Sequence, residues 1–448
     1  MKLKKLWIQD YMNFQNTTIV FNNNIETNFQ KSIFKKMNII LFSGANGTGK
    51  TSIVSFVVKI FRYLERFRER LKSDYMISYE IIEKNKIREI VIRKNNNNIF
   101  INIDGSEYYI MKYNIRKKEY QKNEEIADEK QKKYSEIKNY LPSIVGVYGF
   151  DTAYDHIYYA SNYIGDRLVT YTSIESNYGS SSRGSYISKG IVFVYYNYLK
   201  NKKLRNIFNN LGIMLDDEVD VFVNINSQDE SVRNNKDKLI EYNVYSYLKE
   251  STHGNQKFMI TKYLKNRKGY RNLCDLIDMT NIYINDFFIK KNNEIISISK
   301  MSTGEKKMLF SLFSLATDIN ENGLYIWEEP ETHLNVNWAK NLIPILVELF
   351  NEFNIQLLLT SHNTYMIKNL FQNQIFRTKK NKVEQVNFNT FLANDTEINN
   401  RLLSNDCTSF FEDMFIDYLK NCDINNKKEL INILGESYLK FLLVKTME

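Results

Sequence analysis

A glycine-rich turn limits the folds open to this chain more than any other segment. The turn reads Gly44-Ala45-Asn46-Gly47-Thr48-Gly49-Lys50-Thr51, a full match to the phosphate-binding pattern. The residues before it, Asn38 to Phe42, are almost continuously apolar and predict a strand buried on both faces. After it, apolar residues recur at helical spacing from Ile53 to Leu71. A strand, a glycine loop and an amphipathic helix in this order predict a nucleotide-binding α/β fold.

Each part of the turn has a chemical reason. Glycines let the backbone curl so that successive N–H groups converge on an anion, and the following helix adds the positive end of its dipole. Lys50 is expected to reach the β- and γ-phosphates, and the Thr51 hydroxyl to ligate Mg²⁺. The predicted nucleotide contacts of this segment are Gly44, Ala45, Asn46, Gly47, Thr48, Gly49, Lys50, Thr51 and Ser52.

A second motif places acids at a strand end. Four apolar residues, 324–327, predict a buried strand whose carboxyl end delivers Glu328 and Glu329 to the rim of a parallel sheet, where ligands bind. Neighbouring residues leave a strand in different directions, so one acid can hold a metal while the other polarises water. We assign Glu328 to magnesium and Glu329 to the general base. The alternative is a solvated acidic turn.

Two weaker features complete the set. Ser302 with Glu305 three residues on is a capping box, which predicts a helix start, and a capped helix start is also an anion site. The apolar run 357–359 predicts another buried strand, which ends in a polar turn at His362. A lone histidine at a strand end is usually structural, but this one stands where a γ-phosphate sensor would.

In their order, these four elements resemble the ABC ATPase family. The resemblance implies a dimer that sandwiches ATP, in which the signature of one subunit closes over ATP bound to residues 44–51 of the other, and His362 touches the γ-phosphate. The signature residues are Ser302, Thr303, Gly304 and Glu305. Because the chain carries one set of motifs, the partner is most simply a second copy. The implied cofactors are ATP and Mg²⁺.

Within that family the chain resembles the branch of SMC, RecF and OLD proteins, which acts on nucleic acid and includes AAA-type ATP-binding proteins of phage-defence systems. The similar segments are LWIQDYMNFQNTTIVF, EEPETHL and TSHN. Glu328 stands where the family usually has Asp, and Thr303 replaces a frequent glycine. No clear glutamine marks the junction of the lobes, for which the strand 144–148 and the following residues to Asp151 are the expected region.

The predicted fold class is α/β, a P-loop NTPase of the ABC ATPase type, with a mixed β-sheet core, an antiparallel β portion and an inserted helical lobe. Short strands are expected between residues 88 and 111, a solvated helix or helical hairpin over 112–140, and a loop over 176–185. The expected domains are 1–75 with the glycine loop, 76–290 with the meander and the inserted lobe, 291–375 with the signature, acids and histidine, and 376–448 as a helical tail.

Composition adds little to this. The excess of 61 Lys and Arg over 52 Asp and Glu can reflect the base composition of an AT-rich genome. No apolar run approaches the roughly 20 residues that span a bilayer, and the start lacks the pattern of a secretory signal. Three widely spaced cysteines show no pattern for disulfides or zinc. A cytoplasmic protein without a membrane partner is expected.

These features lead to a switch ATPase that dimerises around ATP, acts in DNA-related processes or anti-phage defence, and controls a separate effector. DNA or a phage component is a candidate trigger, with the basic stretch 62–70 and the segment 112–140 as candidate contacts. The alternatives are the nucleotide-binding subunit of an ABC transporter, or a scaffold that hydrolyses ATP weakly. A nuclease is disfavoured, since Glu412, Asp413 and Asp417 read as the solvated face of a helix.

Overall fold

The computed structural model describes residues 1–21, 27–66, 71–114, 117–149, 169–173, 181–215, 221–224, 255–258, 264, 266–279, 283–291, 293–403 and 444–445. Residues 1–403 form one compact unit and residues 404–448 a second. Glu412, Asp413, Asp417 and nearly all of the second unit lie outside the described residues, as do Phe150 and Asp151. Within the described residues, every helix is too short or too polar to cross a bilayer.

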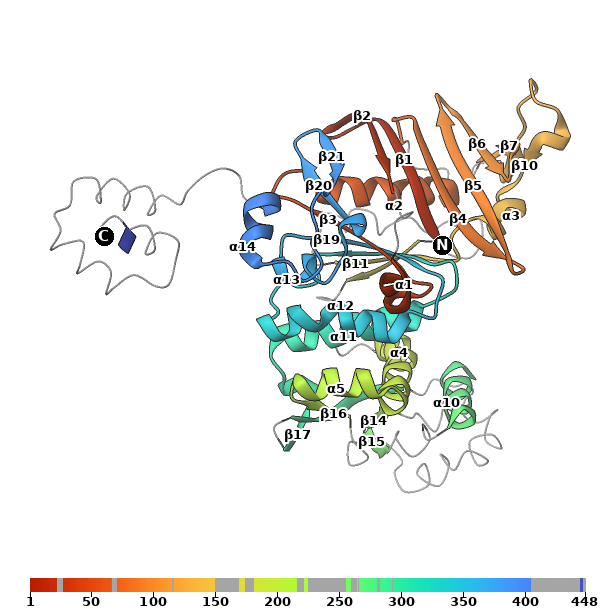
Figure 1. Ribbon diagram of the computed structural model, residues 1–448. Helices are drawn as coiled ribbons and strands as arrows, with labels where there is room; N and C mark the ends of the chain where they lie inside the picture. The colour runs from red at the N-terminus through yellow and green to blue at the C-terminus, as the bar shows by residue number, and fades with distance from the viewer. Residues whose placement is uncertain are drawn as a thin grey trace. The chain divides into compact units, whose positions relative to one another are not determined.

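A seven-stranded, mostly parallel sheet carries the motifs (Figure 1). Its order is β12 (Val169–Ser173), β11 (Val145–Gly149), β18 (Leu324–Glu328), β19 (Gln356–Ser361), β3 (Asn38–Ser43), β20 (Ile375–Lys379) and β21 (Lys382–Gln385). All neighbours are parallel except β20 and β21. The register pairs Glu328 with Thr360 and Ser361 with Ser43, so the glycine loop, the acids and the histidine turn all follow strands that end at one edge.

The two faces of this sheet belong to different hydrophobic cores. Ile40 and Phe42 of β3 pack with α2 (Lys50–Arg66), whereas Ile39 and Leu41 pack with α11 (Thr303–Asp318), α12 (Val336–Phe350) and α4 (Ser181–Lys200). Because both faces are covered, the central strands read as continuous apolar runs. The buried strand predicted before the glycine loop is thereby confirmed.

A mostly antiparallel sheet covers α2 and starts at the N-terminus. Its order is β10 (Gln131–Lys132), β7 (Ser106–Ile110), β6 (Asn98–Ile103), β5 (Lys86–Asn95), β4 (Tyr75–Glu83), β1 (Lys2–Tyr11) and β2 (Phe14–Val20). The expected meander and first hairpin are present. Strand β4 pairs with β1, so this sheet crosses the boundary expected between residues 75 and 76. Alternate residues of β4 are buried, a period of two that gives the strand one face toward α2.

Two expectations of helix are wrong. Residues 112–140 form β8 (Lys112–Asn114), β9 (Glu119–Gln121), β10, the single turn α3 (Tyr134–Ile137) and 3-10 turns. This segment has no apolar stripe at helical spacing, and the Gln131 side chain instead closes a loop by donating to the carbonyls of Asn123 and Ile126 at 3.0 and 2.6 Å. The tail expected to be helical from residue 376 begins instead with β20 and β21, which extend the main sheet. α14 (Asp395–Ile398) and the π-helical turn Asn399–Leu403 follow.

The inserted lobe combines helices with a small sheet. Among its described residues, the helices are α4, α5 (Lys202–Asn210) and α10 (Arg267–Met279), and the strands are β13 (Ile213–Met214), β14 (Val221–Asn224), β15 (Asn255–Phe258), β16 (Tyr283–Lys291) and β17 (Glu294–Ser297). The expectation of a mostly helical lobe therefore missed these strands. The loop expected over 176–185 is wrong from Ser181, where α4 begins, and residues 176–180 lie outside the described part.

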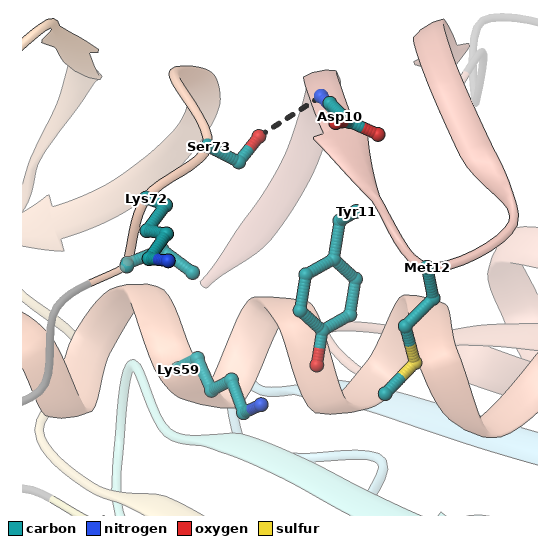
Figure 2. Close-up of a pocket in the computed structure, with 7 residues that line it drawn as sticks. Asp10, Tyr11, Met12, Lys59, Lys72 and Ser73 are labelled. Atoms are coloured by element: carbon teal, nitrogen blue, oxygen red, sulfur yellow. Dashed lines mark hydrogen bonds between the residues drawn. The ribbon is translucent and has the colours of Figure 1, made fainter.

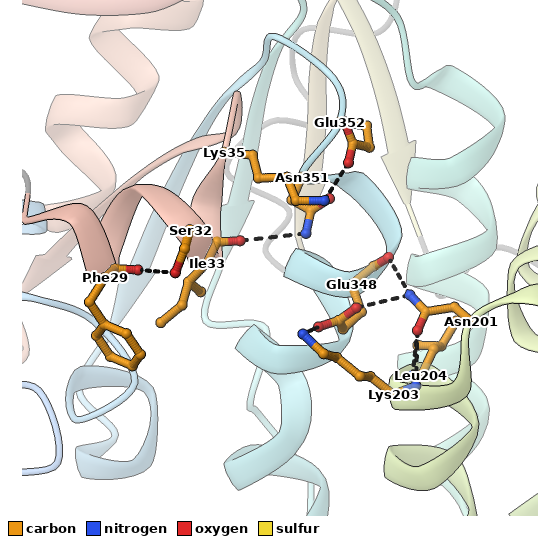
Figure 3. Close-up of polar contacts among 10 residues, drawn as sticks. All are labelled: Phe29, Ser32, Ile33, Lys35, Asn201, Lys203, Leu204, Glu348, Asn351 and Glu352. Carbon is orange, nitrogen blue, oxygen red and sulfur yellow. Dashed lines mark hydrogen bonds and ion pairs between the residues drawn. The ribbon is translucent and has the colours of Figure 1, made fainter.

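Helix α12 contacts both the inserted lobe and the N-terminal part of the chain (Figure 3). Asn201 caps α5, and its Nδ2 donates to Glu348 Oε2 at 2.9 Å. At the end of α12, Asn351 Nδ2 donates to the Ile33 carbonyl of α1 (Asn28–Phe34) at 3.4 Å, and Lys35 pairs with Glu352. The helix that follows the acidic strand thus contacts both halves.

Candidate nucleotide-binding site

The glycine loop adopts a backbone that side chains disfavour. Gly44, Gly47 and Gly49 have φ angles of +155°, +76° and +96°. A Cβ on Gly44 would lie 2.4 Å from the Thr378 carbonyl oxygen, and one on Gly49 would lie 2.7 Å from the Phe14 ring. The loop therefore passes directly against β20 and the first hairpin, and glycine is what permits both approaches.

The Lys50 side chain folds back into the glycine loop that precedes it. The side chain is buried, and Nζ donates to the carbonyls of Gly44 at 2.9 Å and Ala45 at 3.2 Å. Burial lowers the pKa of Lys50. Three carboxylates oppose this lowering: Glu329, Glu331 and Glu328. The lysine and the acids of the second motif therefore lie within electrostatic reach of one another, as their predicted roles require.

The predicted general base has a strained backbone. Glu329 has φ of +39°, a conformation rare outside glycine, and its N–H donates to the Thr360 carbonyl at 3.0 Å. His362 Nδ1 lies 3.4 Å from Glu329 Oε1, and the two side chains are 52% and 38% exposed. The structure thus brings these two predicted residues together at the open edge of the sheet.

A third acid, Glu331, was not predicted as a site residue. It is 6% exposed, and the Ser361 hydroxyl donates to its Oε1. Among the described residues, its Oε2 has no hydrogen-bond partner. Burial raises the pKa of Glu331, and the hydrogen bond from Ser361 opposes this. The sequence signal was available, because this acid follows the paired glutamates after a single proline.

Thr378 was also missed. Its Oγ1 lies 2.7 Å from the Thr48 hydroxyl oxygen of the glycine loop and donates to the Ser43 carbonyl at 3.2 Å. Thr48 in turn donates to the Ala45 carbonyl at 2.8 Å. A threonine on β20 therefore braces the loop from the side, and no local motif marks it.

The signature forms the N-terminus of α11. Ser302 caps the helix, Glu305 closes the capping box, and both Ser302 and Thr303 are exposed. Lys291 Nζ lies 2.6 Å from Glu305 Oε1, so the Glu305 carboxylate shapes the helix end. Gly304 packs against the turn after the acidic strand, because a Cβ there would lie 2.2 Å from the His333 carbonyl oxygen. Ser302 and Thr303, at the start of the helix, are the exposed residues of the signature.

The donor set suits magnesium. Thr51 is exposed in the first turn of α2, and Glu328 is a buried carboxylate at the end of β18. Mg²⁺ takes oxygen ligands and usually keeps positions for water and substrate phosphates. In the parts of the chain that the structure describes, no group of three or more acidic, histidine or cysteine side chains could hold a metal by itself. A magnesium ion here would depend on a bound nucleotide.

A separate hollow of about 390 Å³ lies beside α2 (Figure 2). It is lined by Asp10, Tyr11, Met12, Lys59, Leu71, Lys72 and Ser73. Lys59 Nζ lies 5.0 Å from the centre of the Tyr11 ring. Arg62, named above as the start of a basic DNA contact, is 2% exposed, so that part of the expectation is wrong. The side chains of residues 66–70 lie outside the described part.

Comparison with known proteins places the chain in a family. The profile described as AAA ATPase domain matches residues 1–367. The chain belongs to the AAA ATPase domain family. This AAA ATPase domain covers both halves of the site, from the glycine loop to His362. The match confirms the prediction of an AAA-type ATPase.

The relatives are distant. The retron Ec83 probable ATPase of Escherichia coli is 30% identical over 105 residues, which is 21% of this chain and 19% of that protein. The SMC head domain from Thermotoga maritima covers 87% of this chain and 100% of its own, with a TM-score of 0.39 and 11% identity. The Pyrococcus furiosus Smc head domain bound to the C-terminal domain of ScpA covers 87% and 96%, with a TM-score of 0.37 and 12% identity.

Proposed function

We propose that the chain is an ATP-binding and hydrolysing switch that dimerises around ATP. The observation that carries the proposal is that Lys50, Glu329 and His362 follow strands that end at one edge of the parallel sheet, with His362 Nδ1 3.4 Å from Glu329 Oε1. In open α/β sheets this edge is where ligands bind. The AAA ATPase family match supports the same chemistry.

Each side chain has a role in hydrolysis. The N–H groups of the glycine loop and Lys50 hold the phosphates. Glu329 accepts a proton from the attacking water, and His362, 3.4 Å away, contacts the γ-phosphate and keeps the carboxylate in place. Thr51 and Glu328 would hold Mg²⁺, which would neutralise charge on the phosphates when bound.

The second half of the proposal is dimerisation. Ser302 and Thr303 are exposed at a capped helix end, where N–H groups and the helix dipole favour an anion. One chain offers the glycine loop and its partner offers this end, so two copies enclose two nucleotides. Closure then depends on ATP, and hydrolysis releases it.

The biological setting is proposed from the retron relative. Its printed name is a probable ATPase of a retron, and the local similarity supports a role in DNA-related processes or anti-phage defence with a separate effector. The alternatives remain a transporter's nucleotide-binding subunit and a weakly hydrolysing scaffold. The scaffold is favoured by one observation, the longer Glu328 at the position where the family usually has Asp.

ATP hydrolysis by the purified chain tests the chemistry. We expect Glu329→Gln to lower kcat by about 10²- to 10⁴-fold, the usual range for losing a general base, while ATP still binds. Lys50→Ala should abolish ATP binding. Glu352→Gln, which changes an exposed carboxylate paired with Lys35, is the matched control and should behave as the wild type. Unchanged ATP turnover in both Lys50→Ala and Glu329→Gln would refute the proposal.

A further inference from the structure

We propose that Glu331 is a positioning residue whose buried carboxylate holds the turn that carries His362, and thereby sets the imidazole against Glu329. The inference rests on the proposed ATPase activity and adds a residue that acts through His362. Glu331 itself need not touch the nucleotide.

The contacts run through one hydroxyl group. Ser361 Oγ donates to Glu331 Oε1 and accepts the N–H of Asn363 at 2.9 Å. Ser361 is fully buried and Glu331 is 6% exposed. His362 stands between the two residues that meet at this hydroxyl. Ser361 therefore contacts the carboxylate directly, and Asn363 is linked to it through the Ser361 hydroxyl.

The other end of the link is equally well fixed. Glu331 and Glu329 belong to one tight turn, in which Thr332 N–H donates to the Glu329 carbonyl at 3.0 Å and Leu334 N–H to the Glu331 carbonyl at 2.9 Å. The backbone of Glu329 is held in addition by Thr360, the neighbour of Ser361 on β19. These hydrogen bonds connect the turn after β18 to the turn after β19. The connection holds the backbones that carry Glu329 and His362 at a fixed separation.

A purely structural role explains the arrangement less well. Burying a carboxylate is costly unless its oxygens are paired, and an apolar side chain would fill the position without that cost. In the described residues Glu331 Oε2 lacks a hydrogen-bond partner. A buried carboxylate kept next to the reacting groups, at a cost in stability, is typical of a site that must hold a fixed geometry.

The test compares variants that keep or remove the link. Ser361→Ala removes the hydroxyl and Glu331→Met removes the acceptor, whereas Glu331→Gln keeps an oxygen that can accept from Ser361. We expect Ser361→Ala and Glu331→Met to lower kcat for ATP about 10- to 100-fold with KM changed less than about twofold, because misplacing a reacting group by about 1 Å costs this much. Glu331→Gln should retain most of the activity.

A control and a double-mutant cycle separate positioning from stability. Thr390→Val removes a buried hydroxyl that donates to the Leu370 carbonyl at 2.8 Å, and should leave kcat unchanged. In a His362→Ala background, Ser361→Ala should have little further effect, because the group that it positions is gone. Equal losses in both backgrounds would overturn the inference. So would wild-type kcat for Ser361→Ala.

The outcomes also distinguish this inference from the proposed function. If Lys50→Ala and Glu329→Gln abolish turnover but Ser361→Ala and Glu331→Met do not lower it, the positioning role is refuted and the ATPase stands. If the wild-type chain does not hydrolyse ATP, both are refuted. Should Glu331→Met fail to fold, Ser361→Ala decides alone, since it deletes a single oxygen.

Discussion

At the scale of single residues, the site places several charged side chains where little solvent reaches them. Lys50, Glu328 and Glu331 are each 6% exposed. Charges that are buried together interact more strongly than exposed charges, because their surroundings screen them poorly. A triphosphate would add negative charge beside Lys50, and magnesium would offset the repulsion between that charge and the carboxylates. The arrangement is therefore suited to binding both together.

The capping box of the signature gives a prediction that depends on pH. Burial tends to raise the pKa of Glu305, but the hydrogen bonds from Lys291 and Ser302 prevail and lower it below its ordinary 4.5. A lowered pKa stabilises the fold above the ordinary pKa, and this contribution is lost as pH falls through the folded value. We expect Glu305→Gln to lower the free energy of unfolding by about 1 kcal/mol at pH 7.

Urea unfolding of the wild type and Glu305→Gln from pH 7 to pH 3 measures this difference. It should shrink as the pH drops below 4.5, because the unfolded carboxylate then takes up a proton while the folded one, with its lowered pKa, does so only at lower pH. Glu124→Gln, at an exposed carboxylate away from the site, serves as a surface control. A difference that stayed constant over the whole range would contradict the assignment of the ion pair.

The residues that the sequence identified are those that form contiguous motifs. Glu329, His362 and the start of the loop from Gly44 to Thr51 each come within three residues of the end of an apolar run, so their place at a strand end could be inferred. Thr378 and Ser361 could not be found in this way. Their partners are Thr48 and Glu331, which come near only when the strands pair, and neither threonine nor serine has a local pattern that marks such a role.

At the scale of elements, β20 braces the glycine loop. A Cβ on Gly44 would meet the backbone of Thr378 at 2.4 Å, whereas one on Gly47 would find nothing within 4 Å. We expect Gly44→Ala to lower stability by about 2 kcal/mol or more and to weaken ATP binding, because a strand has to move. Gly47→Ala should cost only about 1 kcal/mol, from its left-handed backbone.

Thermal unfolding and ATP binding of the two variants, compared with the wild type, test this contrast. Each variant adds the same methyl group to the same loop, so Gly47→Ala is the matched control for Gly44→Ala. Equal effects would show that β20 does not support the loop.

Elements with a clear period were predictable and the others were not. The alternation in β5, β6 and β7 and the helical repeat of α2 predicted these elements correctly. Residues 112–140 carry many charges and few apolar side chains, so their turns depend on contacts such as those of Gln131 with Asn123. Several strands of the inserted lobe are short and pair with distant partners, for example β14 with β16. Such pairing has no local signal.

At the scale of the whole molecule, the excess of basic residues can be interpreted only from where those residues lie on the surface. The outer residues of β5 are largely neutralised, since Arg88 pairs with Glu83 and Asp104, and Arg93 pairs with Glu107. The hollow beside α2 presents Lys59 and Lys72 together with Tyr11. If the chain binds DNA directly, this hollow is the better candidate for a phosphate contact.

Lys59→Ala should then weaken DNA binding at low salt and reduce the slope of log K against log salt concentration by about one. Lys86→Ala on β5, an exposed lysine away from the hollow, is the control. Binding measured by fluorescence anisotropy at several salt concentrations gives both quantities. An unchanged slope for Lys59→Ala would exclude this hollow as a phosphate contact.

The proposed dimer is the feature that one sequence predicts least directly. The motifs indicate that a signature exists, and the structure shows Ser302 and Thr303 exposed at the start of α11. What covers them depends on a second chain. Hence the fold and the contacts within one copy could be reasoned from strand order and motif position, whereas the assembly has to be measured.

Light scattering on the Glu329→Gln variant with and without ATP measures that assembly directly. The account predicts a change from one chain to two on adding ATP and magnesium, because binding persists while hydrolysis is blocked. Ser302→Asp keeps a residue that caps the helix but places a negative charge against the phosphates, so it should prevent the change. The same mass with and without ATP, or a dimer that Ser302→Asp leaves intact, would contradict the proposal that ATP is held between two copies.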